Sequence, residues 1–91
     1  MASDAPPPPN DDPVVWEPSN LKHLLRDNPE RRVSKLQIDE VLADHDRTER
    51  WDEAHQSWEV RGRTLNGRKL TVAWVPHRNG RFPVHVRPSW R

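Results

Sequence analysis

Residues 57–75 read SWEVRGRTLNGRKLTVAWV, and this stretch decides the fold. Apolar and polar residues alternate along it, which is the period of a strand with one buried face. Its first half divides into an inner and an outer set: Trp58, Val60 and Gly62 against Glu59, Arg61 and Arg63. Asn66-Gly67 in its centre is a strong hairpin signal, because both residues tolerate positive φ. We therefore predict two antiparallel strands joined by a tight turn.

A third strand is predicted after the second one. Asn79-Gly80 marks another turn, and alternation resumes over 81–87, with the odd-numbered residues on one face and the even-numbered residues on the other. Pro83 has no backbone N–H, so this strand is expected at a sheet edge or with a bulge. A short additional strand at 14–16 stays open as an option.

Two helices are predicted before the strands. Leucines recur at helical spacing over 21–25, with Ser19 or Asn20 as the cap and Pro29 as the end. Their spacing predicts one buried face for this helix.

The second helix has the clearer local signature. Ser34 followed by Gln37 makes a capping box, and Val33 with Ile38 suits a hydrophobic staple. This helix should end near Asp44. Residues 45–56 are polar and charged, and we interpret them as a loop or a frayed extension of the helix, with the packing of Trp51 left open.

These elements predict an α+β domain, with two N-terminal helices packed on an antiparallel sheet of three to four strands. We place this single domain at 14–91. Residues 1–13 include five of the ten prolines and are predicted to be a disordered tail.

Composition excludes several classes of function. The chain has 91 residues and no cysteine, so disulfides, a thiol nucleophile and a cysteine zinc site are ruled out. No apolar run has the length of a membrane span, and no basic-then-apolar leader is present, so we expect a cytoplasmic protein without membrane partners. No spaced ligand set or glycine-rich phosphate loop is found, and we predict neither a metal nor a cofactor.

The net charge of +1 conceals a strong asymmetry. Residues 1–54 carry 7 bases and 13 acids (7 − 13 = −6), whereas residues 55–91 carry 8 bases and 1 acid (8 − 1 = +7). Seven of those eight bases are arginine, whose planar guanidinium suits phosphate. The basic half therefore indicates a phosphate-bearing partner; a solvated sheet face that pairs with acidic helices is the alternative.

Several groups of residues keep a specific order along the chain: Trp16, Asn20 and His23; Val33-Ser34; Asp39-Glu40-Val41-Leu42 with Asp44; and Gly62-Arg63-Thr64 followed by Asn66-Gly67-Arg68, Leu70 and Val72. Arg87-Pro88 then follows on the last predicted strand. In order and spacing these residues resemble the BrnT family, the toxins of bacterial type II toxin–antitoxin pairs.

The resemblance implies a RelE-like fold, metal-free ribonuclease activity and growth arrest. It also implies a small cognate antitoxin as partner, in a homo- or hetero-oligomer. Where many family members have His-Gly-Val before the second helix, residues 27–33 here read DNPERRV.

Metal-free RNA cleavage uses the neighbouring 2′-hydroxyl as nucleophile and needs a base, an acid and cations around phosphorus. The candidate catalytic residues are Arg63, Arg68, Arg87, His23, His85 and Glu59. The candidate RNA-binding residues are Arg61, Lys69, Arg81 and Trp90. Each has a plainer alternative, such as packing for His23, solvent exposure for His85 and an ion pair for Glu59.

Three functions remain in competition: a ribonuclease toxin, a non-catalytic RNA- or DNA-binding module, and a protein-interaction module. The feature that separates them is whether Arg63, Arg68 and Arg87 converge on one cleft with a histidine or a carboxylate.

Overall fold

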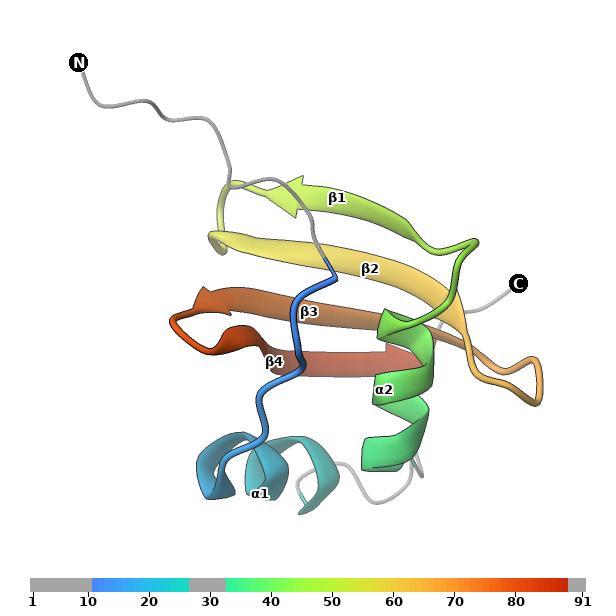
Figure 1. Cartoon of the computed structure of the whole chain (residues 1–91), viewed down its shortest axis with the longest axis horizontal. Helices are drawn as coiled ribbons and strands as arrows, with labels where there is room; N and C mark the ends of the chain where they lie inside the picture. Colours follow the sequence, from blue (N-terminus) through green and yellow to red (C-terminus); the bar gives the residue numbers. More distant parts are fainter. Residues whose placement is uncertain (1–10, 27–32, 89–91) are drawn as a thin grey trace.

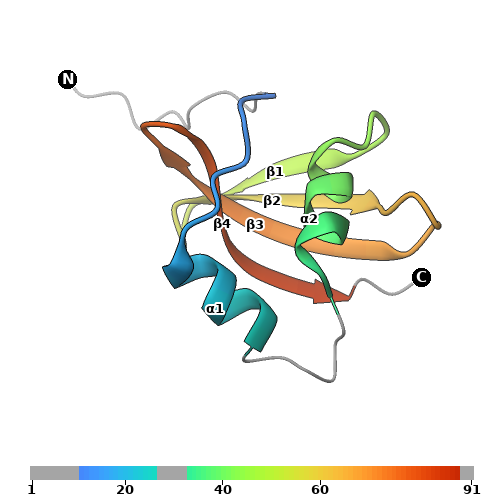
Figure 2. The same cartoon turned by 60° about the horizontal axis from the view of Figure 1, so that its bottom comes forward.

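The computed structural model describes residues 11–26 and 33–88. Two helices precede four strands: α1 (Pro18–Arg26), α2 (Lys35–Leu42), β1 (Thr48–Asp52), β2 (Ser57–Arg63), β3 (Lys69–His77) and β4 (Gly80–Pro88). The strands form one antiparallel sheet in the order β1-β2-β3-β4, so chain neighbours are sheet neighbours (Figure 1). Figure 2 shows both helices on the same side of this sheet. The predicted α+β class, with two helices and an antiparallel sheet, is confirmed.

Helix α1 begins at Pro18. Proline has no backbone N–H, but the first N–H groups of a helix have no intrahelical acceptor, so no hydrogen bond is lost. The prediction that Ser19 or Asn20 caps this helix is wrong, because both residues lie inside it. Asn20 has another role. Its side-chain oxygen accepts a bond from the backbone N–H of Glu17, while its amide nitrogen donates to the carbonyls of Val15 (3.1 Å) and Pro83 (3.0 Å). Asn20 is buried and ties the segment before α1 to β4.

Helix α2 has the predicted capping box. The Ser34 hydroxyl accepts from the Gln37 backbone N–H at 3.1 Å, and the Gln37 side chain accepts from the Ser34 N–H at 3.1 Å. Ile38, Val41 and Leu42 are fully buried against the sheet. The helix ends at Leu42, close to the predicted end.

Strand β1 overturns the interpretation of 45–56 as a loop or helical extension. Within it Trp51 packs inward, edge-on to Trp58 with ring centroids 5.5 Å apart. The other inward position of β1 is Glu49, whose carboxylate lies 3.8 Å from the Arg47 guanidinium. A charged residue at an inward position hides the alternation, and this is why the pattern did not predict the strand.

The β2–β3 hairpin is confirmed, but its turn differs from the two-residue form. Gly67 has φ +88°, whereas Asn66 keeps a negative φ. The Gly67 N–H bonds the Thr64 carbonyl, and the Thr64 N–H bonds the Arg68 carbonyl. The loop therefore has three residues, with glycine alone in the left-handed region.

Strand β4 lies at the sheet edge and carries a bulge, and both features that Pro83 suggested are present. Ala73 pairs with His85 and Trp74 pairs with Pro83, so Val84 is an extra residue in the ladder. An extra residue reverses which side chains point to each face. The predicted single alternation over 81–87 is therefore wrong.

Residues just before α1 pair with the free edge of β4. The Arg81 N–H bonds the Pro13 carbonyl at 2.8 Å, and the Val15 N–H bonds the Arg81 carbonyl at 2.7 Å. Val14 makes an isolated parallel bridge there, in place of the optional strand at 14–16. Contacts thus extend into the end of the segment predicted as a tail, whose residues 1–10 lie outside the described structure.

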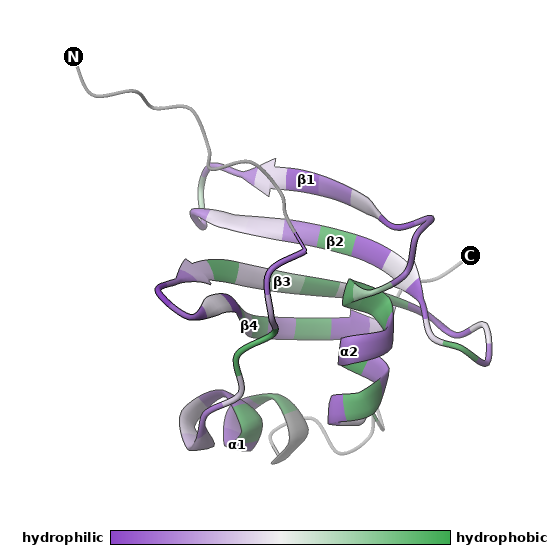
Figure 3. Ribbon diagram, in the orientation of Figure 1, coloured by the Kyte–Doolittle hydropathy of each residue, from purple (hydrophilic) through white to green (hydrophobic). Residues whose placement is uncertain are grey.

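The two faces of the sheet differ sharply. The covered face, which meets α1 and α2, carries the apolar core: Leu24, Ile38, Val41, Leu42, Trp58, Val60, Leu70, Val72, Trp74 and Val86. Trp58 and Trp74 stack there with ring centroids 6.4 Å apart. Figure 3 shows hydrophobic and hydrophilic bands alternating along β2, β3 and β4. We call the opposite side, formed by the alternate residues of the four strands, the open face.

Candidate nucleic-acid interface

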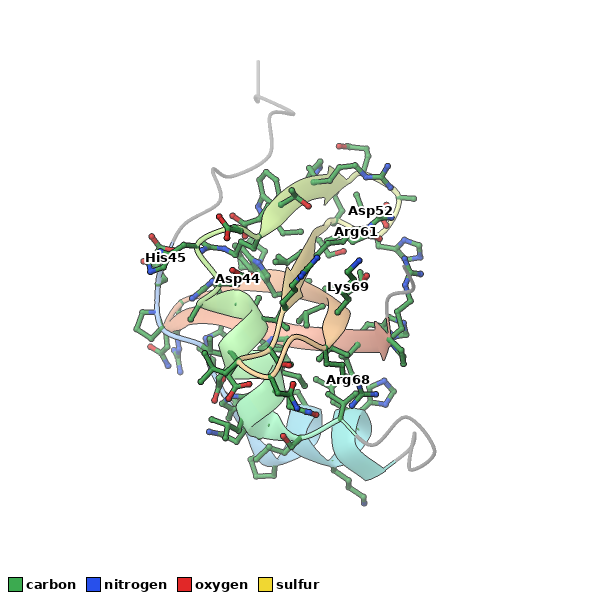
Figure 4. All side chains as sticks on the ribbon, turned by 90° about the vertical axis from the view of Figure 1, so that its right-hand side faces the viewer. Asp44, His45, Asp52, Arg61, Arg68 and Lys69 are labelled. Carbon is green, nitrogen blue, oxygen red and sulfur yellow. The ribbon has the colours of Figure 1, made fainter. Side chains whose placement is uncertain are left out.

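The open face carries most of the basic residues of the sheet. The strand registers place the following residues outward: Arg50, Asp52, Glu59, Arg61, Arg63, Lys69, Thr71, Ala73, His85 and Arg87. Five of these are basic and two are acidic, a balance of 5 − 2 = +3 with histidine neutral. In Figure 4, Arg61 and Lys69 lie on this side of the sheet, whereas Asp44 and His45 lie on the side of α2. A positive sheet face of this kind attracts phosphate.

Two cross-strand rows organise the centre of the open face. Glu59, Ala73 and His85 are partners across β2, β3 and β4. The alanine between the two titratable residues is short, so the middle of this row is shallow. Two inter-strand steps put the ends of a row about 10 Å apart at Cα. All three residues line one hollow, in which Glu59 and His85 stand on either side of Ala73.

The neighbouring row consists of Arg61, Thr71 and Arg87. It lies two residues along each strand from the first row, or about 7 Å away. The two arginines therefore flank the same shallow region from one side.

Glu59 is the centre of a charged cluster. Its carboxylate lies 3.6 Å from a guanidinium nitrogen of Arg87, 3.7 Å from Arg61 and 3.9 Å from Arg50. The Glu59 side chain is 17% exposed, and the three arginine side chains are 47% to 76% exposed. One carboxylate is thus surrounded by three cations whose remaining N–H donors face solvent. Such an arrangement orders the guanidinium groups and leaves an excess of donors for an anion.

A hollow of about 420 Å³ opens beside this cluster. The residues around it include Asp52, His55, Glu59, Ala73, His85 and Arg87. We call it the Glu59 hollow. It brings together three of the predicted catalytic residues, namely Glu59, His85 and Arg87.

Asp52 and His55 were not predicted as site residues. A carboxylate oxygen of Asp52 lies 2.8 Å from Nδ1 of His55, and this hydrogen bond holds the pKa of Asp52 below its usual value. The signal in the sequence is an Asp and a His three residues apart within 45–56, which the charged composition of that segment concealed.

Arg68 lies on the other side of the sheet. Its guanidinium donates to the Gln37 side chain of α2 at 3.4 Å, and Figure 4 shows it close to the helices and away from Arg61 and Lys69. The prediction that Arg68 joins the catalytic cations is not supported by this placement.

Arg63 marks the end of β2, beyond the Glu59 hollow. Its backbone N–H donates to Asp44 at 2.8 Å, and Arg63 lines a separate hollow with Asp44, His45 and Leu65. Arg63, Arg68 and Arg87 therefore do not converge on one cleft.

Arg81 is not an RNA-binding side chain in this structure, because it is only 5% exposed. Its Nε donates to the Asp12 carbonyl at 2.7 Å and its Nη1 donates to the Leu42 carbonyl at 3.1 Å. Burial lowers the pKa of this guanidinium. It joins the segment before α1 to the end of α2.

Two further predicted site residues lie elsewhere. His23 is exposed on α1, which contacts β4 from the covered side. Trp90 lies outside the described residues.

No family model matches the chain, and its comparison with curated proteins and with solved structures gave no match either. Within residues 11–26 and 33–88, no three His, Cys, Asp or Glu side chains are grouped as a metal site would need. The same part of the chain has no helix of sufficient length and apolarity to span a membrane.

Proposed function

We propose that the chain cleaves single-stranded RNA on the open face, without a metal ion. One observation carries the proposal. Glu59 and His85 lie on either side of Ala73 in one cross-strand row, with Arg61 and Arg87 in the next row. The Glu59 hollow thus brings a carboxylate, an imidazole and the Arg87 guanidinium together, and Arg61 lies next to it, 3.7 Å from the Glu59 carboxylate. These are the groups that metal-free transphosphorylation needs.

In the reaction Glu59 takes the proton of the ribose 2′-hydroxyl. The 2′-oxygen forms a bond to phosphorus as the bond from phosphorus to the 5′-oxygen breaks, and an acid gives a proton to that leaving oxygen. Arg61 and Arg87 stabilise the extra negative charge that develops on the phosphoryl oxygens. The products are a 2′,3′-cyclic phosphate and a 5′-hydroxyl end. Of the two histidines that the sequence offers for proton transfer, His23 and His85, only His85 borders the Glu59 hollow.

The resemblance to BrnT toxins supports a cellular role for this activity. In that role the chain is the toxin of a type II pair, acts in the cytoplasm and arrests growth by cutting RNA. Its partner is a cognate antitoxin that covers the basic open face. The RelE-like fold name belongs to the same proposal, which the helices on one side of an antiparallel sheet support.

The test is cleavage of a single-stranded RNA oligonucleotide in excess EDTA. We expect Glu59→Gln and Arg87→Ala each to lower the cleavage rate about 10²- to 10⁴-fold. Arg78→Ala removes an exposed arginine from the β3–β4 turn and serves as the matched control, with a rate close to that of the wild type. A substrate with a 2′-deoxy sugar at the cleaved position should stay intact.

The second candidate function is RNA binding without cleavage. The three ion pairs of Glu59 favour it, since a carboxylate so occupied also serves simply to order the arginines. Wild-type chain that binds RNA in a salt-dependent manner and leaves it intact would replace the first proposal by this one.

A further inference from the structure

The turn between β1 and β2 holds a histidine that a carboxylate orients. Asp52 is the last residue of β1, and its side chain points outward beside the Glu59 hollow. An ionised carboxylate can only accept hydrogen bonds, so Nδ1 of His55 donates across the 2.8 Å contact. Nε2 is thereby left as the ring nitrogen that can exchange a proton with a ligand. The His55 side chain is 78% exposed, so an RNA chain can reach it.

The turn itself is fixed by its own side chains. Gln56 has φ +50°, a left-handed conformation that is unfavourable for a non-glycine residue. Its amide donates to the Glu53 carbonyl at 2.8 Å, and Glu53 in turn accepts from the Trp51 indole at 2.8 Å. The His55 backbone N–H also donates to Asp52. These bonds fix the shape of the turn and with it the place of His55 beside the Glu59 hollow.

His55 and Glu59 border the same hollow from different elements. Glu59 comes from the middle of β2, whereas His55 comes from the turn that precedes β2. In-line displacement at phosphorus places the attacking and the leaving oxygens on opposite sides of the phosphorus atom. The base and the acid must therefore approach the phosphate from different directions, as these two residues can.

We infer that His55, positioned by Asp52, is the general acid that protonates the leaving 5′-oxygen. The inference rests on the proposed ribonuclease function and adds a residue to it. The imidazolium gives its Nε2 proton to the 5′-oxygen as the bond to phosphorus breaks, and Glu59 has accepted the 2′-hydroxyl proton, so protons balance. Asp52 is a positioning residue, because it acts through His55. His85 then contacts the substrate without supplying this proton.

A substrate whose leaving group needs no proton tests this assignment. In RNA with a bridging sulfur in place of the scissile 5′-oxygen, the thiolate leaves without an acid. We expect His55→Ala to slow cleavage of ordinary RNA about 10²- to 10⁴-fold. With the sulfur substrate the same variant should come within a few-fold of the wild type. Asp52→Asn should lose less activity on ordinary RNA, and the sulfur substrate should restore it as well.

Two variants serve as controls. Glu59→Gln should remain slow on both substrates, because the base is still needed. His45→Ala removes an exposed histidine on the side of α2 and should match the wild type on both (Figure 4). Urea unfolding of each variant verifies that it is folded.

The outcomes separate the two proposals. If the sulfur substrate rescues His85→Ala and leaves His55→Ala slow, His85 is the acid and this inference is overturned while the ribonuclease function stands. If folded wild-type chain cleaves neither substrate, the ribonuclease function itself fails.

Discussion

The two faces of one sheet show that the position of an arginine along a strand decides what it does. Arg81 and Arg87 lie six residues apart on β4. Arg81 pairs with Pro76, points to the covered face and is bound to backbone carbonyls, whereas Arg87 pairs with Thr71 and lies beside Glu59 on the open face. In a regular strand an even separation would put both on one face. The bulge at Val84 separates them.

Deleting Val84 removes the bulge that puts Arg81 and Arg87 on opposite faces, and of all the variants we expect it to reduce stability the most. Without the bulge, either Arg81 moves to the open face or His85 and Arg87 turn into the core, because a one-residue shift reverses every side chain. Each outcome buries unpaired charge or empties the core, and we expect the cooperative unfolding transition to be lost. Urea unfolding followed by tryptophan fluorescence measures it. Val84→Ala keeps the residue count and is the control, with a loss below about 1.5 kcal/mol.

Arg81→Ala tests the covered half of the comparison alone. The variant removes the Arg81 donor from the buried Leu42 carbonyl, and it also loses the bond to the carbonyl of Asp12, an exposed residue. An unsatisfied buried acceptor costs about 1–3 kcal/mol. We expect a loss of about 2–4 kcal/mol of unfolding free energy by urea denaturation. RNA binding by the folded fraction should be unchanged. A variant that keeps its stability but loses RNA binding would contradict the buried placement of Arg81.

Local signals in the sequence predicted the elements whose determinants are near neighbours. The Ser34–Gln37 capping box and the hairpin turn at Gly67 each act within four residues. Both are present, although the turn has three residues and Asn66 does not share the positive φ of Gly67. Asn20 and Arg81 differ, because their partners lie far along the chain, at Pro83 and Leu42 respectively. A composition-based interpretation gives such residues a surface role, and only the tertiary structure shows them buried.

Like the fold, the candidate site was predicted in part. Alternation in β2 placed Glu59 and Arg61 correctly on one face. In β4 the alternation was right for His85 and Arg87 but wrong for Arg81, because the bulge changes the phase of the strand by one residue. The His55 turn was missed because β1 was not recognised as a strand.

Arg87→Ala and Arg68→Ala compare the two faces in RNA binding. Both are arginines that the sequence assigned to catalysis, but only Arg87 lies on the open face. For single-stranded RNA each lost phosphate contact reduces the slope of log K against log salt by about 0.7. We expect this reduction for Arg87→Ala and none for Arg68→Ala. Fluorescence anisotropy measures the binding, with a single-stranded oligonucleotide whose 2′-deoxy sugars prevent cleavage. Equal reductions in both variants would mean that RNA also contacts the covered side.

Asp44→Asn tests the contact between the segment after α2 and the end of β2, and we expect it to change the free energy of unfolding the least. The Asp44 carboxylate accepts from the Arg63 N–H at 2.8 Å and from the Asp46 N–H at 2.9 Å, so it joins the segment after α2 to the end of β2. These bonds, the one from Arg63 first, hold the pKa of Asp44 below its usual value of 3.8. A carboxyl whose pKa is lower in the folded state stabilises the fold above the unfolded pKa, and this contribution is lost as pH falls through the folded pKa. Urea unfolding at about pH 7 should therefore show Asp44→Asn as less stable than the wild type, and at about pH 2.5 the difference should have narrowed. If the stability difference between Asp44→Asn and the wild type does not change with pH, the charge of Asp44 does not stabilise the end of β2. Packing then fixes the end of the strand that carries Glu59 and Arg61.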